Sequence, residues 1–230
     1  LVFKRKSRSI MHIATHGIIA SSGGGFENTL STSFDGVDEY ISFTDTTYNG
    51  AFSLSFWFNP TTLVGGRFLC GRPAISDYVW LRSTSQIRVR VAYSTKSFSE
   101  TGGNNIVVGV WNHLLVVRDA SNNINLFLNG GGFSTSQVAT GDFNVSQIGK
   151  AGSNEFVGNL NNVAFWNSDQ AVNRTIIYNS GSPDNLSALN PLLWYRLGNG
   201  DTYPNIIDNG GSNDGLMQNM SSANFVADVP

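Results

Sequence analysis

The carboxylates of this 230-residue chain are too scattered for glycoside hydrolysis. That reaction requires two carboxyl groups at a set separation, one on each side of the scissile bond. On a strand, such a pair would occupy alternating positions that face one groove. Gly36 predicts a turn between Asp35 and Glu39, and Asp38 is adjacent to Glu39, so a strand would turn those two apart. None of the four glutamates has an acid two residues away: Glu27, Glu39, Glu100 and Glu155. We therefore expect no enzymatic activity.

Other nucleophiles and bases do not form a catalytic set either. His113 shares an apolar segment with Trp111, which is typical of a hydrogen-bonded structural histidine. Cys70 is the sole cysteine, which excludes an internal disulfide and a cysteine-based zinc cluster, and its apolar surroundings predict a buried, inert thiol. The glycine runs at 23–25 and 130–132 lack the lysine or the strand-to-helix context of a phosphate loop.

Exposed aromatic rings beside amide and carboxylate groups would suit a sugar ligand. The candidates by type are Tyr78, Trp80, Tyr93, Trp57 and Trp166. Tyr78 and Trp80 are two residues apart and share one strand face, so this pair is the predicted glycan platform. The alternative interpretation is that these rings belong to the core, as most aromatic residues of a β-sandwich do.

Composition indicates a β protein. Charged residues make up 13% of the chain, whereas a typical protein has about 25%. Gly, Ser, Asn and Thr are abundant, as in strands joined by polar turns. A formal net charge of −2 gives no electrostatic reason to expect nucleic-acid binding. No segment after the N-terminus approaches the apolar length of a membrane span.

Alternating apolar and polar residues predict strands at regular intervals. They cover residues 52–60, 67–71, 78–82, 87–92, 110–118, 124–128, 158–167 and 192–197. Arg88 and Arg90 lie on one face of their strand, and Asn129 with Gly130 marks a tight hairpin. A helical period occurs only at 169–179. The fold class is all-β, a two-sheet antiparallel sandwich with one short helix.

The N-terminal 25 residues have a different composition. Lys4, Arg5, Lys6 and Arg8 precede a weakly apolar stretch and a glycine-rich hinge. We interpret residues 1–25 as a basic attachment arm and residues 26–230 as a single domain, with a separate C-terminal tail as the alternative. A signal peptide cleaved near Ala20 is the other interpretation of this arm.

Several segments together resemble a known family, the laminin-G-like, concanavalin A-like jelly rolls of secreted and viral proteins. The resemblance rests on residues 34–41, 52–60, 111–113, 116–119, 126–130 and 156–166. It implies a jelly roll and a structural calcium site in which Asp35 or Asp38 meets the closing strand. This chain has Asn161 and Asn162 where the family carries acids, and neutral amides bind calcium less strongly. The alternative is that Asp35 caps a turn while both asparagines form hydrogen bonds across the sheet. We expect no cofactor.

The C-terminal run is similar to the ends of jelly-roll proteins from tailed-phage virions. The similarity covers residues 194–200, 208–215 and 227–230. It implies a structural component of the virion surface, a head-decoration or tail-associated protein, that assembles with other virion proteins through its N-terminal arm as part of an oligomer. The alternative is a secreted, carbohydrate-binding lectin-like domain that recognises cell-surface glycans.

Overall fold

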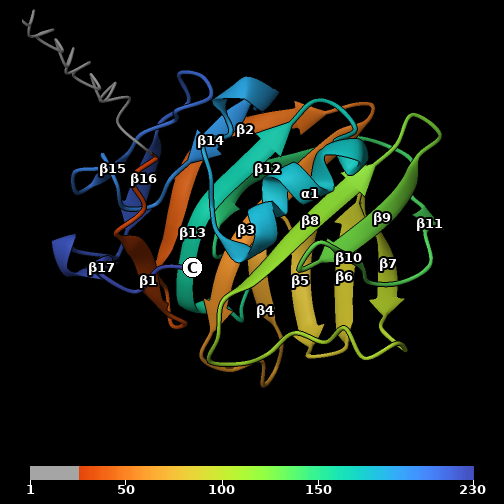
Figure 1. Ribbon diagram of the computed structural model, residues 1–230, viewed down its shortest axis with the longest axis horizontal. Coiled ribbons are helices and arrows are strands. Elements are labelled where there is room, and N and C mark those ends of the chain that lie inside the picture. The colour runs from red at the N-terminus through yellow and green to blue at the C-terminus, as the bar shows by residue number, and fades with distance from the viewer. Residues whose placement is uncertain (1–25) are drawn as a thin grey trace, which may run out of the picture.

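The computed structural model describes residues 26–230, and the predicted basic arm with Lys4, Arg5, Lys6 and Arg8 lies outside them. Two antiparallel sheets pack face to face (Figure 1). This arrangement confirms the predicted β-sandwich. No helix in the described part of the chain has the length and hydropathy that crossing a bilayer requires.

The first sheet has nine strands in the order β10-β9-β8-β3-β13-β1-β17, with β11 paired to β9 and β14 paired to β13. Its longest members are β3 and β13, which pair along most of their length. The strands are β1 (Ser31–Asp35), β3 (Phe52–Pro60), β8 (Asn112–Arg118), β9 (Asn123–Leu128), β10 (Gly131–Gly132), β11 (Gln137–Val138), β13 (Val157–Trp166), β14 (Leu193–Tyr195) and β17 (Phe225–Val226).

The second sheet has eight strands in the order β15-β16-β2-β12-β4-β5-β6-β7. Its members are β2 (Tyr40–Tyr48), β4 (Arg67–Gly71), β5 (Tyr78–Ser83), β6 (Gln86–Val91), β7 (Ser94–Ser99), β12 (Phe143–Ile148), β15 (Asn205–Ile206) and β16 (Gly215–Gln218). Strand β7 has a single buried residue, Phe98, and forms one edge of this sheet.

Strand alternation directs one set of side chains into the space between the sheets. Phe56 and Phe165 of the first sheet meet edge to face there, with ring centroids 5.8 Å apart. Leu81, Val89 and other fully buried residues complete this core from the second sheet. Burying each such side chain contributes about 1.5–3 kcal/mol, so the core is the main source of stability.

A helical segment seals the outer face of the first sheet. It comprises η1 (Ala171–Asn173), α1 (Arg174–Tyr178), η2 (Asn179–Gly181) and η3 (Ser187–Leu189). Helix α1 lies over the first sheet (Figure 1). Its residue Ile177 is buried in a second cluster with Leu115, Val117 and Trp166 of the sheet. The helical period at 169–179 therefore predicted this element correctly, although its first turn is a 3-10 helix.

The C-terminal strands pair with the first strands of the chain. Strand β16 pairs with β2, and β17 pairs with β1. Asp228 anchors the tail because its carboxylate accepts hydrogen bonds from Trp111 Nε1 at 3.0 Å and Asn159 Nδ2 at 2.6 Å. The sandwich is thus completed by residues far apart in sequence.

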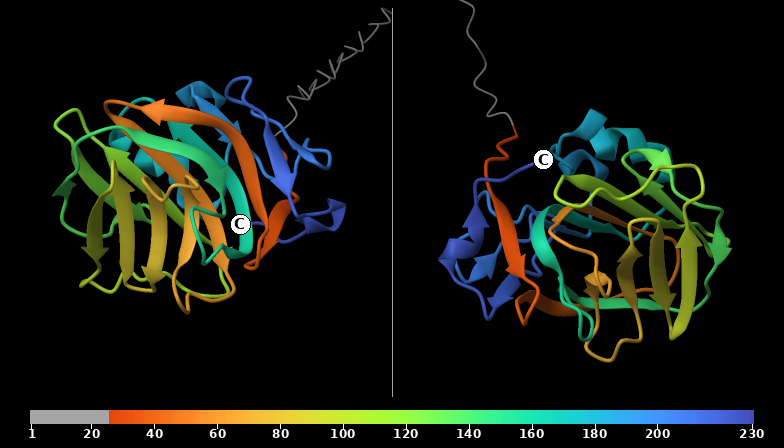
Figure 2. Two further views of the ribbon diagram at one scale, coloured as in Figure 1. Left: turned by 180° about the vertical axis from the view of Figure 1, so that it is seen from behind. Right: turned by 90° about the horizontal axis from the view of Figure 1, so that it is seen from below.

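Among residues 26–230, no helix covers the outer face of the second sheet (Figure 2). Seen from behind, β4 to β7 lie toward the viewer and no helix crosses them (Figure 2). The two sheets therefore differ. The outer face of the first sheet packs against the helical segment through a second hydrophobic cluster, whereas no helix of residues 26–230 packs on the outer face of the second sheet (Figure 2).

Candidate ligand-binding face

An aromatic–arginine cluster lies on the outer face of the second sheet. Cross-strand register places Trp80 opposite Arg88 and Tyr78 opposite Arg90, while Phe68 stands opposite Trp80 on its other side. Alternation along β5 adds Arg82 to the same face. The members of the cluster are Phe68, Tyr78, Trp80, Arg82, Arg88, Arg90 and Tyr93.

The rings of the cluster contact one another. Phe68 stacks on Trp80 at a centroid distance of 5.4 Å and an interplanar angle of 21°. Tyr78 meets Trp80 edge to face at 6.2 Å. The predicted pairing of Tyr78 with Trp80 on one face is therefore present, but the expected exposure is not. Tyr78 is only 5% exposed because Phe68 and Ala151 cover it, and Trp80 is half-buried.

Gly66 explains how the Trp80 ring is held. A Cβ atom at this position would lie 2.4 Å from the indole Nε1 and 2.6 Å from Cε2, so only glycine lets the backbone come this close. Its φ of +79° is also one that side-chain-bearing residues rarely adopt. Glycine backbone thus packs against the indole and fixes its orientation.

The arginines lie over these rings. The guanidinium carbons of Arg88 and Arg82 are 5.2 Å and 5.5 Å from the Trp80 centroid. Arg90 lies between Tyr78 and Tyr93, 5.7 Å from each ring. In residues 26–230 the ion pairs are Arg72 with Asp45 and Lys150 with Glu155, so none of the cluster arginines has a carboxylate partner.

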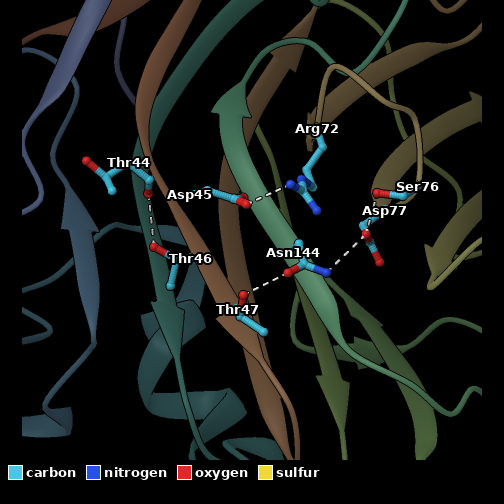
Figure 3. Close-up of polar contacts among 8 residues, drawn as sticks. All are labelled: Thr44, Asp45, Thr46, Thr47, Arg72, Ser76, Asp77 and Asn144. Carbon is cyan, nitrogen blue, oxygen red and sulfur yellow. Dashed lines mark hydrogen bonds and ion pairs between the residues drawn. The ribbon is translucent and has the colours of Figure 1, made fainter.

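Next to the cluster, a polar network fixes the start of β5 (Figure 3). Asp77 is fully buried, and its carboxylate accepts hydrogen bonds from Ser76 Oγ at 2.7 Å and from the backbone N–H of Ala92 at 2.8 Å. Asn144 lies between Thr47 and Asp77, at 2.7 Å from the hydroxyl and 3.5 Å from the carboxylate. The network ties β2, β12 and β5 together and holds the β6–β7 turn.

That turn has an unusual backbone. Ala92 and Tyr93 form the two-residue link between β6 and β7, with φ of +46° and +66°. Both values are left-handed, a conformation that favours Gly or Asn. The contact of Asp77 with Ala92, together with the hydrogen bond from Tyr93 N–H to Ser76 O at 2.9 Å, stabilises it. As a result, the Tyr93 ring is 65% exposed beside Arg90.

The residues of the implied calcium site do not converge. Register pairs Asp35 with Val157 and Thr32 with Leu160, so Asn161 lies four positions further along β13 than the partner of Asp35. At about 3.3 Å per residue this is roughly 13 Å. Asp38 is exposed in the following turn. Within residues 26–230 no group of three His, Cys, Asp or Glu side chains could hold a metal ion. Asp35 and Asn161 therefore do not lie side by side in the described part of the chain, and calcium binding stays a prediction.

Each of these residues has a structural role instead. Asp35 Oδ1 accepts a hydrogen bond from Val37 N–H at 2.8 Å and so caps its own turn. Asn161 Nδ2 donates to Leu30 O at 2.8 Å, and Asn162 Oδ1 accepts from Trp194 Nε1 at 2.5 Å. Both asparagines are buried at a bulge of β13. This confirms the alternative of a turn cap and hydrogen bonds within the fold.

The remaining polar and aromatic candidates are also structural. Trp57 and Trp166 are 2% and 1% exposed. His113 packs against both Trp57 and Tyr178, and its Nε2 is 2.9 Å from Ser55 Oγ. Burial lowers the pKa of His113 to about 3, which keeps the imidazole neutral. The predicted structural histidine is confirmed.

A shallow pocket of about 270 Å³ near Asp208 is lined by Thr46, Leu192 and the 211–213 loop. The Asp208 carboxylate already accepts hydrogen bonds from three backbone N–H groups, those of Trp194, Gly210 and Asn213, at 2.8–3.1 Å. This carboxylate organises its own loop. The aromatic–arginine cluster is thus the stronger candidate site.

Sequence reasoning identified part of this cluster. It placed Tyr78 with Trp80 and put Arg88 with Arg90 on one face, but it did not join the two pairs, nor include Arg82 or Phe68. Strand alternation could have predicted that Arg82 belongs to this face, because Arg82 lies two residues beyond Trp80 on the same strand.

Comparisons with known proteins identify the fold family. Residues 35–174 match the family Laminin_G_3, described as the concanavalin A-like lectin/glucanases superfamily. No curated protein sequence matches the chain. A structure from Bacteroides ovatus ATCC 8483, named as a candidate carbohydrate-binding protein, superposes with a TM-score of 0.67 at 15% identity. That similarity covers 85% of this chain and 59% of the other, so the chain spans less than two thirds of that protein.

Two further structures share the architecture at lower similarity. The heptameric SAP-like pentraxin of Limulus polyphemus has a TM-score of 0.53 at 14% identity over 82% of this chain and 95% of its own. The extracellular region of zebrafish Gpr126/Adgrg6 has a TM-score of 0.54 at 10% identity over 87% of this chain and 26% of its own. Identities this low establish the shared fold alone. The family match covers more than half of the sequence and agrees with the two-sheet sandwich, so the chain belongs to the concanavalin A-like lectin/glucanases superfamily.

Proposed function

We propose that this protein is a carbohydrate-binding, lectin-like domain that uses the outer face of the second sheet. The observation that carries the proposal is the aromatic–arginine cluster on a sheet face that no helix of residues 26–230 covers (Figure 2). Half-buried Trp80 lies there beside guanidinium groups, and the exposed residues Thr95 and Ser97 lie on β7, opposite Arg90 and Arg88. Aromatic surface with convergent polar groups is the usual composition of a sugar site.

The outer face of the first sheet is a poor alternative. Its aromatic residue Trp57 is stacked under Tyr178 of the helical segment, at a centroid distance of 5.8 Å and an interplanar angle of 16°. Trp166 donates its indole N–H to Leu189 O at 3.0 Å. These rings stabilise the helical cover, so a ligand would have to displace it.

A glycan array tests the proposal. We expect saturable binding by the full chain and a loss of affinity of about tenfold or more in Trp80→Ala, because this change removes the ring that lies under Arg82 and Arg88. Trp111→Ala is the matched control because Trp111 is also half-buried but lies at the end of the first sheet, beside Asp228. Absence of binding to every glycan, or an equal loss in the Trp111 variant, would refute the proposal.

The virion role inferred from the C-terminal run stays a prediction, as do virion-surface or secreted localisation and assembly into an oligomer. The lectin-like proposal has the more direct support, since the superfamily match and the open sheet face both favour it. Incorporation of a chain lacking residues 1–25 into virions would contradict attachment through the arm.

A further inference from the structure

The geometry points to an acidic polysaccharide, one with carboxylate groups on its sugars, as the ligand of the aromatic–arginine cluster. This inference rests on the proposed function and specifies the chemical class of the glycan. It depends on Arg82, Arg88 and Arg90, which carry positive charge on one sheet face without a carboxylate to balance it.

The charge of the cluster contrasts with that of its domain. Four of the 14 basic residues lie in residues 1–25, which contain no acid, so residues 26–230 carry ten basic and sixteen acidic side chains, a net charge of −6. Three of those ten basic residues share the outer face of β5 and β6. A local positive face on a negative domain attracts an anionic ligand to one place.

Arg88 and Arg90 can offer a ligand their terminal N–H groups but not their Nε atoms, which are buried. Arg88 stacks over Trp80, and Arg90 lies beside Tyr78 and Tyr93. The Nε atoms of Arg88 and Arg90 are buried without a hydrogen-bond partner among the described residues. An arginine stacked by its flat face is pre-organised, and its terminal N–H groups can donate two parallel hydrogen bonds to a carboxylate.

Spacing favours a polymer over a single anion. Arg88 and Arg90 are two residues apart on one strand, which separates their Cα atoms by about 6.6–6.8 Å. Arg82 adds a third guanidinium group on the neighbouring strand. Successive acidic sugars of one chain can therefore meet successive guanidinium groups, and the exposed Thr95 and Ser97 can bond to sugar hydroxyls.

The same features disfavour single-stranded nucleic acid, which binds through exposed aromatic faces that stack on bases. Here Phe68 and Arg88 cover the Trp80 ring, and Tyr78 is buried. Among the aromatic rings of the cluster, Tyr93 alone is largely exposed. A single exposed ring cannot stack with several successive bases.

The test measures binding of the full chain to polygalacturonate, to a neutral galactan and to single-stranded DNA. The variants are Arg88→Gln with Arg90→Gln, the matched Arg174→Gln on the helical segment of the opposite face, and a chain with Lys4, Arg5, Lys6 and Arg8 all changed to Gln. Thermal unfolding of each variant confirms that it is folded. Arg174 is exposed and packs over Phe127, so its replacement removes a comparable charge elsewhere.

We expect polygalacturonate to bind best and to weaken with salt, because exposed charges are screened. The double variant should lose affinity by about tenfold for each arginine removed, the scale of a charge-assisted hydrogen bond. Arg174→Gln and the arm variant should bind as the wild type does. Replacement by Lys at positions 88 and 90 should recover only part of the affinity, because lysine keeps the charge without the planar fork.

Three outcomes would overturn the inference. Binding to the neutral galactan alone would reject acidic ligands and leave the proposed carbohydrate-binding function intact. Loss of polygalacturonate binding in the arm variant, or stronger binding to DNA, would assign the charge recognition to a different surface or ligand. No binding to any saccharide would reject the inference and the proposed function together.

Discussion

His113 shows how one side chain links burial to pH. Its imidazole is 1% exposed, is packed by Trp57 and Tyr178, and contacts the Ser55 hydroxyl. The Nδ1 atom is buried without a partner in the described part of the chain. A charged imidazole would lose hydration there and gain little in return, so the folded protein keeps it neutral.

We predict that acid destabilises the protein through His113. Its pKa is about 3 in the folded state and about 6.5 in the unfolded chain, so between these values only the unfolded chain binds the proton. The free energy of unfolding should therefore fall as the pH drops below 6.5, with a limiting slope of about 1.4 kcal/mol per pH unit. Urea unfolding at several pH values measures this slope.

His113→Gln is the control for this prediction, because it removes the titrating group and leaves every other ionisable residue in place. The difference in unfolding free energy between wild type and variant should shrink as the pH falls. A difference that stays constant from pH 7 to pH 4 would contradict the assigned role of His113.

The hydrogen-bond partners of Asn161 and Asn162 could not be predicted from the sequence. The family resemblance implied acids at the positions of Asn161 and Asn162, and this suggested a weak metal site. Their actual partners are Leu30 O and Trp194 Nε1, both distant in sequence. No local pattern encodes such contacts, because the register between β1 and β13 and the path of the C-terminal segment decide them.

At the scale of elements, the β6–β7 turn shows a conflict between local preference and position. Ala92 and Tyr93 adopt left-handed backbone, which costs residues other than Gly about 1–2 kcal/mol each. Asp77 and Ser76 hold the turn in this shape. Strained turns of this kind often coincide with functional sites, and here the turn presents Tyr93 beside Arg90.

Ala92→Gly and Tyr93→Gly should separate strain from binding. We predict that Ala92→Gly raises the free energy of unfolding by about 0.5 kcal/mol, since relief of strain exceeds the added entropy of the unfolded chain. Its affinity for polygalacturonate should stay unchanged. Tyr93→Gly should remain folded and bind more weakly because it loses the ring beside Arg90. Equal affinity in both variants would show that Tyr93 takes no part in binding.

Several strands were predicted from the sequence, but β2 and β12 were not, although their buried residues also alternate. The ranges 52–60 and 67–71 agree with β3 and β4 at both ends. Asn129 and Gly130 correctly predicted a tight link, and both have positive φ. Strand β7 was missed because its sequence STKSFS holds one large apolar residue, Phe98. An edge strand needs little apolar surface, so pairing with β6 rather than sequence pattern defines it.

At the scale of the whole molecule, both sheets and the helical cover form within residues 26–230. The first described aromatic residue, Phe26, stacks on Trp194 at 6.1 Å, and β1 begins soon afterwards. The family resemblance made the overall sandwich predictable. The sequence did not predict that only the first sheet has a helical cover among the described residues, because this depends on where the segment after β13 packs.

We predict that a chain beginning at Phe26 folds as the full chain does. Its free energy of unfolding should agree with that of the full chain within about 0.5 kcal/mol, the usual range for changes away from packed contacts. Urea unfolding monitored by tryptophan fluorescence measures it. A loss of several kcal/mol would show that residues 1–25 belong to the domain.

The position of β7 at the edge of the second sheet has a consequence for how a polymer is engaged. In residues 26–230, β7 is the last strand at this side of the second sheet, so the aromatic–arginine cluster lies near the margin of the face. If the proposed function holds, an internal segment of a polysaccharide can bind across the strands, and the end of the polysaccharide need not enter the site. Recognition would then be indifferent to chain ends, and the number of protein molecules bound per polymer would rise in proportion to its length.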